Sequence, residues 1–136
     1  MQYADEQVPE GLKRWFVIHF IVDVLTAVPL FLFPYTILEV LGWPQTDPVM
    51  TRLFAAALFA IGIESFLGRN AGVEAFKGML NLKLIWSSFA AGGILISLLQ
   101  NPEYSTMLSW AGVTIFLLFN AVWCYWRIVL EQKTEK

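Results

Sequence analysis

The stretch from Pro48 to Leu67 reads PVMTRLFAAALFAIGIESFL, and it decides the fold class of this chain. Only two of its side chains carry a charge, Arg52 near the start and Glu64 near the end. An α-helix of about 20 residues rises about 30 Å, which is the thickness of the hydrocarbon core of a bilayer. In hydrocarbon, every backbone polar group must find its partner within the segment. The stretch therefore predicts a membrane-spanning helix.

Three further stretches share this apolar character, so that the predicted spans cover residues 15–33, 48–67, 79–99 and 107–128. Pro34 breaks the chain after the first span, and Gly42 to Pro44 end the short segment that follows, which predicts a short interfacial helix. Asp47 before Pro48 is a typical helix start. We expect an all-α fold, in which residues 1–136 form one integral membrane domain built as an antiparallel bundle of four transmembrane helices.

The composition excludes the main alternatives to a membrane protein. Of the 136 residues, 57% are hydrophobic and 15% are charged, and the mean hydropathy is +0.60. A soluble domain of this size buries only about two-thirds of its surface and could not hide so many apolar side chains. The formal net charge of −2 argues against a nucleic-acid partner, which requires a basic excess. With one cysteine and one histidine, we expect no metal site and no cofactor.

The distribution of basic residues predicts the orientation of the chain. Eight of the nine Lys and Arg residues lie toward the end that holds both termini and the turn at 68–72, and only Arg52 lies near the other end. Cytoplasmic loops carry an excess of Lys and Arg, so both termini are expected in the cytoplasm.

Polar side chains inside the spans are the candidates for a functional site, because such groups are costly in lipid and face the bundle interior. His19 and Asp23 lie one turn apart on one face of the first span, so they point inward together. The residues that we expect to line a polar pocket in the cytoplasmic half are His19, Asp23, Glu64, Asn81 and Asn120, with Lys83 beside them. The alternative is that these side chains serve only as contacts between helices.

The charges of three residues, Glu64, Lys83 and Arg52, predict specific pairings. Glu64 and Lys83 lie at nearly the same depth on adjacent antiparallel helices, which predicts a structural ion pair, unless Lys83 extends to the membrane interface instead. Arg52 lies about one turn below the outer surface, where it can reach Glu39, lipid headgroups or Asp23.

Small residues predict where helices approach closely. Ala56 and Ala60 lie four residues apart on the second span, and Ser88 and Gly92 have the same spacing on the third. This spacing is typical of closely packed membrane helices. We therefore expect the second and third spans to pack along these faces.

With its flanks, the second span resembles small four-span bacterial and archaeal membrane proteins of the DoxX-like/DUF4345 type. Those proteins share a Pro after the first span, an Arg early in the second, a Gly in its middle and a basic inner turn. The corresponding residues here are Pro34, Arg52, Gly62 and Arg69. The resemblance implies a compact four-helix bundle in the plasma membrane of a prokaryote, and it implies no particular activity.

A more distant likeness is to membrane bundles of the sterol-isomerase and sigma-2 type. In those bundles a His, carboxylates and Trp residues line a lipophilic cavity. This likeness implies similar roles for His19, Asp23, Glu64 and Trp86, although no motif matches residue by residue.

Three function classes fit these observations. The first is binding of a small lipophilic molecule in the polar pocket, with or without enzymatic transformation of it. The second is a non-catalytic structural or assembly subunit of a membrane complex, and the third is a carrier of protons or small solutes. The expected partners are membrane lipid, a small lipophilic ligand, and either a second copy of the chain or another membrane protein.

Overall fold

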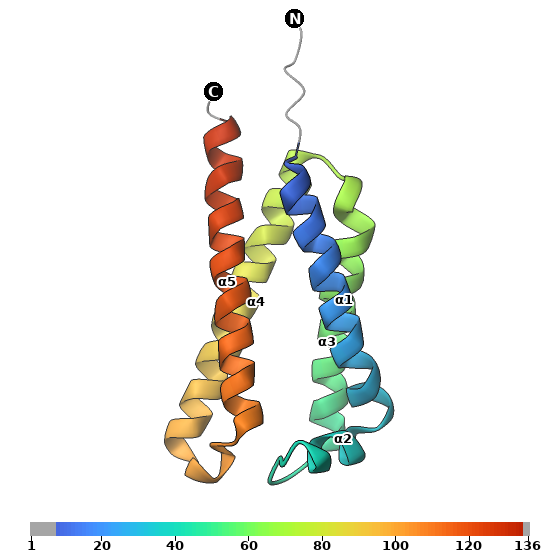
Figure 1. The fold of residues 1–136 in the computed structure, drawn as a ribbon, viewed down its shortest axis with the longest axis vertical. Coiled ribbons are helices and arrows are strands. Elements are labelled where there is room, and N and C mark those ends of the chain that lie inside the picture. Colours follow the sequence, from blue (N-terminus) through green and yellow to red (C-terminus); the bar gives the residue numbers. More distant parts are fainter. Residues whose placement is uncertain (1–7, 135–136) are drawn as a thin grey trace, which may run out of the picture.

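The computed structural model describes residues 8–134, and all regular elements in that range are helices (Figure 1). Their order is α1 (Glu10–Leu32), α2 (Pro34–Val40), α3 (Pro48–Leu67), η1 (Gly68–Asn70), α4 (Val73–Gln100), η2 (Pro102–Tyr104) and α5 (Met107–Thr134). The 4 long helices α1, α3, α4 and α5 are long and apolar enough to cross a membrane. The predicted all-α bundle of four spanning helices is confirmed, and the chain is a multi-pass membrane protein.

The helices extend beyond the predicted spans at the end that holds both termini. α1 and α4 begin earlier than predicted, and α5 continues to Thr134. The added turns carry charged side chains that support the helix at its surface, such as the ion pair between Lys77 Nζ and Glu74 Oε1 at 2.8 Å. Hydropathy marks only the part of a helix that lies in hydrocarbon, so it does not register these polar turns.

The local signals between the spans act as predicted. α2 is the short helix expected after the first span, and Gly42 follows it with a φ of +74°, which favours glycine. Asp47 caps α3, since its Oδ1 accepts hydrogen bonds from the backbone N–H groups of Val49 and Met50 at 2.8 and 3.1 Å. These contacts fix where α2 ends and α3 begins.

The four long helices form two pairs. α1 packs along α3, and α4 packs along α5 (Figure 1). The pairs come together near η1, where α1 begins and α5 ends, and they diverge toward α2 and η2. The predicted close approach between α3 and α4 through small residues is wrong, because Ala56, Ala60 and Ser88 are exposed and a Cβ added to Gly92 would meet no atom within 4 Å.

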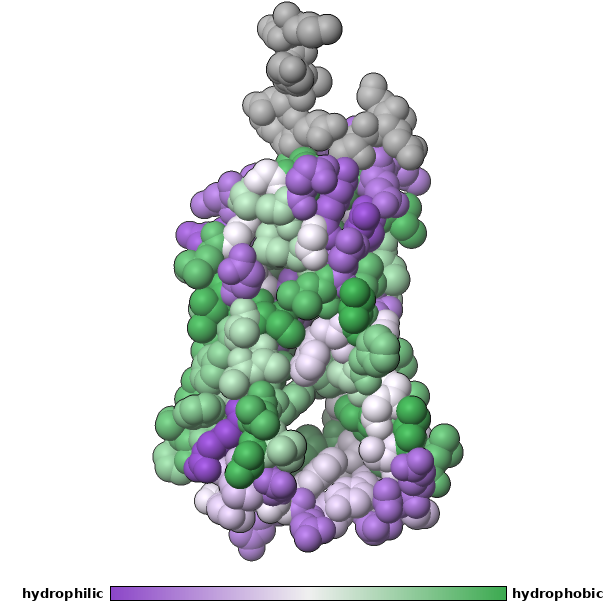
Figure 2. All heavy atoms as spheres, turned by 180° about the vertical axis from the view of Figure 1, so that it is seen from behind, coloured by the Kyte–Doolittle hydropathy of each residue, from purple (hydrophilic) through white to green (hydrophobic). Residues whose placement is uncertain are grey.

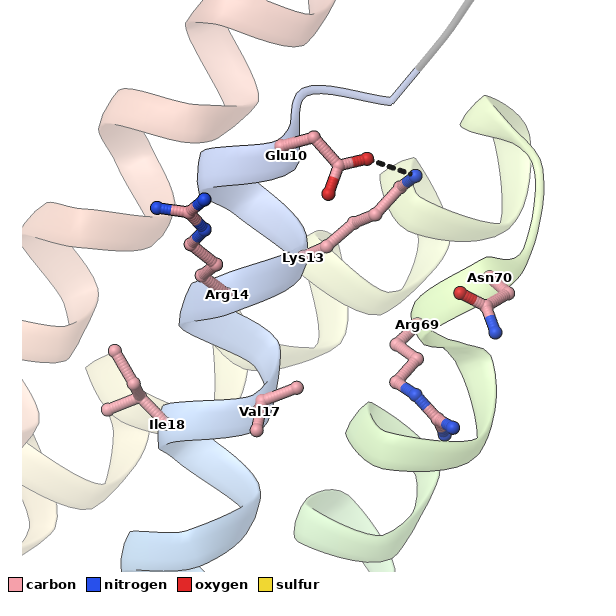
Figure 3. A pocket seen from close by; sticks show the side chains of 7 residues that line it. All are labelled: Glu10, Lys13, Arg14, Val17, Ile18, Arg69 and Asn70. Atoms are coloured by element: carbon pink, nitrogen blue, oxygen red, sulfur yellow. Dashed lines mark hydrogen bonds and ion pairs between the residues drawn. The ribbon is translucent and has the colours of Figure 1, made fainter.

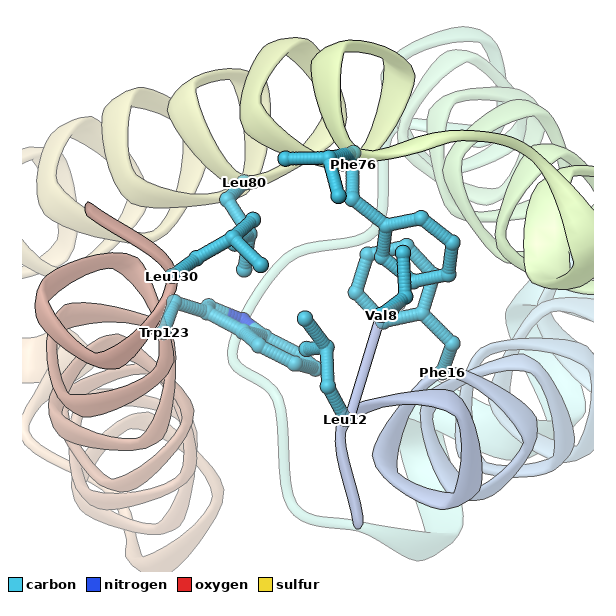
Figure 4. Close-up of a cluster of buried hydrophobic side chains, with 8 residues drawn as sticks. Val8, Leu12, Phe16, Phe76, Leu80, Trp123 and Leu130 are labelled. Atoms are coloured by element: carbon cyan, nitrogen blue, oxygen red, sulfur yellow. The ribbon is translucent and has the colours of Figure 1, made fainter. Parts of the chain in front are cut away.

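Two apolar clusters hold the helices together. The first joins α1, α4 and α5 near the termini, and its members are Val8, Leu12, Phe16, Val73, Phe76, Leu80, Trp123 and Leu130 (Figure 4). The second joins α1 to α3 in the other half through Ala27, Leu30, Ala55 and Leu58. Of these two clusters, the first joins the two helix pairs through buried side chains, whereas the second joins α1 to α3 and is contacted from α4 by the half-buried Trp86.

In the half that holds α2 and η2, the molecular surface is hollowed between the two helix pairs (Figure 2). Aromatic contacts bridge the pairs there. Trp86 of α4 stacks on Phe54 of α3 with ring centroids 6.2 Å apart. The ring centroids of Trp43 and Tyr104 lie 5.5 Å apart. The surrounding surface is mostly apolar, with polar residues gathered toward both ends. The hollow therefore opens toward the region that lipid would occupy.

Candidate functional site

Four buried polar side chains meet between the two apolar clusters. They are His19 and Asp23 of α1, Ser65 of α3 and Lys83 of α4, with exposed fractions of 6%, 5%, 1% and 2%. On α1 they follow Phe16 of the first cluster and precede Ala27 of the second, at the spacing of one helix face. Both helix pairs thus contribute to one layer of polar side chains in the membrane interior. We call these four residues the polar layer.

Lys83 is the centre of the polar layer. Its Nζ lies 3.1 Å from Nδ1 of His19 and donates a hydrogen bond to Oγ of Ser65 at 2.5 Å. The same nitrogen lies 4.9 Å from the ring centroid of Phe16 and 5.0 Å from that of Trp123. Ring faces attract a cation, and a desolvated contact of this kind contributes about 2 kcal/mol. The ammonium is therefore held by two polar atoms and two aromatic rings.

Ser65 is fixed by two hydrogen bonds with opposite roles. Its hydroxyl donates to the carbonyl of Ile61 at 2.6 Å, one turn earlier in α3, and accepts from Lys83. Because the hydroxyl has a single hydrogen, its orientation is determined. Ser65 thus links α3 to α4 through Lys83.

His19 lies between a cation and a carboxylate. Its Nδ1 is 3.0 Å from Oδ2 of Asp23 and 3.1 Å from Nζ of Lys83, while Phe119 and Trp123 contact its ring edge-to-face at 4.8 and 5.1 Å. An ammonium group has no acceptor, so when Lys83 is charged, Nδ1 must accept the hydrogen bond from it. Nδ1 then has no hydrogen to offer to Asp23.

Asp23 is the group that this arrangement leaves without a donor. Its Oδ2 is buried and receives no hydrogen bond from any side chain or backbone group in residues 8–134. The side chain also packs tightly, because a Cβ placed on Gly62 of α3 would lie only 2.7 Å from the Cβ of Asp23. Buried polar atoms are almost always hydrogen-bonded, so this exception requires a structural or functional explanation.

Three of the predicted pocket residues lie away from the polar layer. Asn120 of α5 donates from Nδ2 to Oγ of Ser87 at 2.8 Å and of Ser88 at 2.9 Å, which links α5 to α4. Asn81 is exposed and accepts a hydrogen bond from Nε of Arg127 at 3.0 Å. Trp86 packs against the second cluster. The structure brings together only His19 and Asp23 from the predicted lining, with Lys83 beside them.

The predicted ion pair between Glu64 and Lys83 is wrong. Glu64 is exposed, and the next residue, Ser65, is the one that faces Lys83. A difference of one position rotates a side chain by about 100° around a helix. Glu64 is therefore not part of the polar layer.

Arg52 forms neither of its two predicted ion pairs, and its predicted contact with lipid headgroups stays a prediction. Its Nε donates to the backbone carbonyl of Phe31 at 3.0 Å, and no ion pair with Glu39 or Asp23 forms within the described range. Pro34 lacks an N–H group, and the chain breaks from α1 into α2 at Phe33, so carbonyls near the end of α1 need other donors. Arg52 supplies one of them and ties α3 to α1.

Sequence reasoning missed Ser65 and the three rings that enclose the polar layer, Phe16, Phe119 and Trp123. Ser65 had a signal, since it lies three residues after Gly62 on the face of α3 that continues through Leu58 and Ala55. The positions of the three rings could not be predicted from the sequence, because large apolar residues occur on every face of these helices.

Comparisons with protein-family models, with curated proteins and with solved structures gave no match to this chain. The resemblance to the DoxX-like/DUF4345 type therefore stays a prediction, and the candidate function rests on the polar layer itself.

Proposed function

We propose that the protein binds a small lipophilic molecule that carries a hydrogen-bond donor, and that this donor binds Oδ2 of Asp23. The supporting observation is the buried carboxylate oxygen that no donor from residues 8–134 satisfies. A hydroxyl or N–H group of a ligand would complete it, and a hydrogen bond to a charged group is worth about 1.5–3 kcal/mol. The ligand's apolar body would lie against the aromatic side chains around the polar layer.

The separation of the two helix pairs supports a lateral entry route. The hollow between them faces the apolar flank of the molecule, so a lipophilic molecule would enter from the bilayer and not from water (Figure 2). Asp23 lies one turn before Ala27 of the second cluster, and thus beside the half in which the pairs diverge. In this proposal, Lys83 and His19 hold the layer together while Asp23 contacts the ligand.

Long-chain alcohols and matched ethers test this proposal directly. We expect 1-dodecanol, which has an O–H donor, to bind the purified protein in detergent at least ten times more tightly than dodecyl methyl ether, which has none. Asp23→Asn is expected to fold and to lose most of this preference, because an amide oxygen is a weaker acceptor than a carboxylate. Displacement of a brominated dodecanol, whose bromine quenches tryptophan fluorescence, gives the affinities, since Trp123 adjoins the site.

Glu64→Gln is the matched control for this experiment. It removes a carboxylate from the same depth of the helices, but from an exposed position. Its preference for the alcohol should equal that of the unaltered chain. Equal binding of alcohol and ether by the unaltered chain would refute the proposal, and failure of Asp23→Asn to accumulate folded would make Asp23 a structural residue.

We also propose that the protein resides in the plasma membrane of a prokaryote with both termini in the cytoplasm. Lys83 is buried in the polar layer and contributes no charge to a loop. The other basic residues of the range 8–134, except Arg52, still lie toward the end where α1 begins and α5 ends. Their excess at that end favours this orientation.

Site-directed labelling tests the orientation. A cysteine introduced at Asn70 in a Cys124→Ala background should react with a membrane-impermeant maleimide only after the cells are opened. A cysteine at Gln45, between α2 and α3, should react in intact cells. The reverse pattern would place the termini outside the cell.

A further inference from the structure

A groove of about 530 Å³ lies on the outside of α1 next to η1, at the end of the molecule near the termini (Figure 3). Its rim is basic and its floor is apolar. Lys13, Arg14 and Arg69 supply the cations, Asn70 adds an amide, and Val17 and Ile18 lie deeper along α1. The groove is separate from the polar layer, which is buried further along the same helix.

Two of the three cations are held in place by contacts of their own. Lys13 Nζ forms an ion pair with Oε1 of Glu10 at 2.7 Å. Arg69 donates from Nη1 to the carbonyl of Phe66, and its guanidinium carbon lies 3.8 Å from the centre of the Phe66 ring. Phe66 in turn stacks on Phe20 of α1. These contacts fix Arg69 beside the groove and leave its other N–H groups available to an anion.

The charges in the groove are not balanced. Glu10 is the carboxylate that lines it, and it is engaged by Lys13. Neither Arg14 nor Arg69 forms an ion pair with a carboxylate in the part of the chain that the structure describes. Among residues 8–134, the side chains that line the groove therefore carry a net positive charge, at the level where a helix leaves the hydrocarbon.

We infer that this groove binds an anionic phospholipid. The phosphodiester would lie between Lys13, Arg14 and Arg69, and one acyl chain would follow α1 over Val17 and Ile18. A guanidinium presents paired N–H groups that match two phosphate oxygens. A zwitterionic lipid brings its own ammonium group to this basic rim and should bind less well. The apolar floor favours a lipid over free phosphate, which has nothing to place there.

Binding of defined lipids to the purified full-length chain in a neutral detergent tests this inference. We expect native mass spectrometry to show that phosphatidylglycerol binds at least ten times more tightly than phosphatidylcholine with the same acyl chains. The double variant Arg14→Gln/Arg69→Gln should lose about 30-fold in affinity for phosphatidylglycerol, since each cation near the headgroups contributes about 1 kcal/mol. Lys77→Gln/Lys133→Gln removes the same charge at the same end but outside the groove, and it should retain the affinity.

Each other outcome overturns the inference in a distinct way. Equal affinity for the two lipids would show that the groove does not distinguish lipids by the charge of their headgroups. Equal losses in both double variants would indicate attraction to the whole basic end and not to a site. Competition by millimolar inorganic phosphate would indicate a site for the free anion. If the first double variant does not fold, Arg14→Gln alone serves, because Arg14 is exposed, and its affinity should fall about fivefold.

Discussion

Replacing Lys83 by methionine is expected to lower the free energy of unfolding by about 3–5 kcal/mol, because it removes the cation from a buried polar layer and leaves the carboxylate of Asp23 there. Nζ of Lys83 and Oδ2 of Asp23 both lie about 3 Å from Nδ1 of His19, so that the two charges are close neighbours. Methionine has a similar length and fills the space. The loss therefore reports on charge and hydrogen bonding and not on a cavity.

The double variant Asp23→Asn/Lys83→Met distinguishes a coupled pair from two independent residues. Removing both charges leaves neutral groups in the layer, so the double variant should be more stable than Lys83→Met alone. Lys77→Met removes a cation from the surface of α4, where its ion pair with Glu74 is worth at most about 1 kcal/mol. Equilibrium unfolding in mixed micelles gives these free energies. A Lys83→Met variant as stable as the unaltered chain would contradict the central place of Lys83.

The number and type of the helices could be predicted from the sequence, because both follow from the solvent. A segment in hydrocarbon must satisfy its own backbone, so an apolar run of sufficient length has one available structure. The breaks were equally determined by local chemistry. Pro34 cannot continue a helix hydrogen-bond pattern, and Asp47 caps the next helix with its own side chain.

The face that each helix turns inward could not be predicted from the sequence. In a soluble helix, polar residues mark the outside, but lipid is as apolar as the protein core and erases that contrast. Charged residues were then the only indication of which side of a helix faces inward. They led to the prediction of Glu64, whereas Ser65 is the residue that faces Lys83. His19 and Asp23 escaped this error because two polar groups one turn apart restrict the face that can point inward.

The pairing of the helices also lay beyond sequence reasoning. Motifs of small residues predicted contact between the second and third spans, whereas α3 packs along α1. A small residue permits a close approach without requiring one. Gly62 meets Asp23, but Gly92 and Gly93 face open space, and their spacing in the sequence contains no sign of this difference.

Substitution of Gly62 by alanine is therefore expected to destabilise the protein by about 1–3 kcal/mol, although alanine is the better helix former. The new methyl group would lie 2.7 Å from the Cβ of Asp23 and 3.2 Å from its Oδ2. Neither helix has a flexible side chain to move at that point, since the nearest atom is a Cβ fixed to the backbone of α1. α1 and α3 must therefore separate. Gly62→Val should lower the stability of the protein further than Gly62→Ala.

Gly93→Ala is the matched control, because it makes the same change in the middle of a spanning helix where no atom lies within 4 Å of the new Cβ. Its stability should stay equal or rise by up to about 1 kcal/mol, as expected for alanine in place of glycine. Separation of α1 from α3 would also move Asp23 and His19 together away from Ser65 of α3 and disturb the polar layer, so Gly62→Ala should weaken the binding of 1-dodecanol while Gly93→Ala leaves it unchanged. Equal stability of the two variants would mean that α1 and α3 do not pack closely at this position. A stability loss in Gly62→Ala with unchanged dodecanol binding would instead separate the helix contact from the ligand site and place the alcohol away from Asp23.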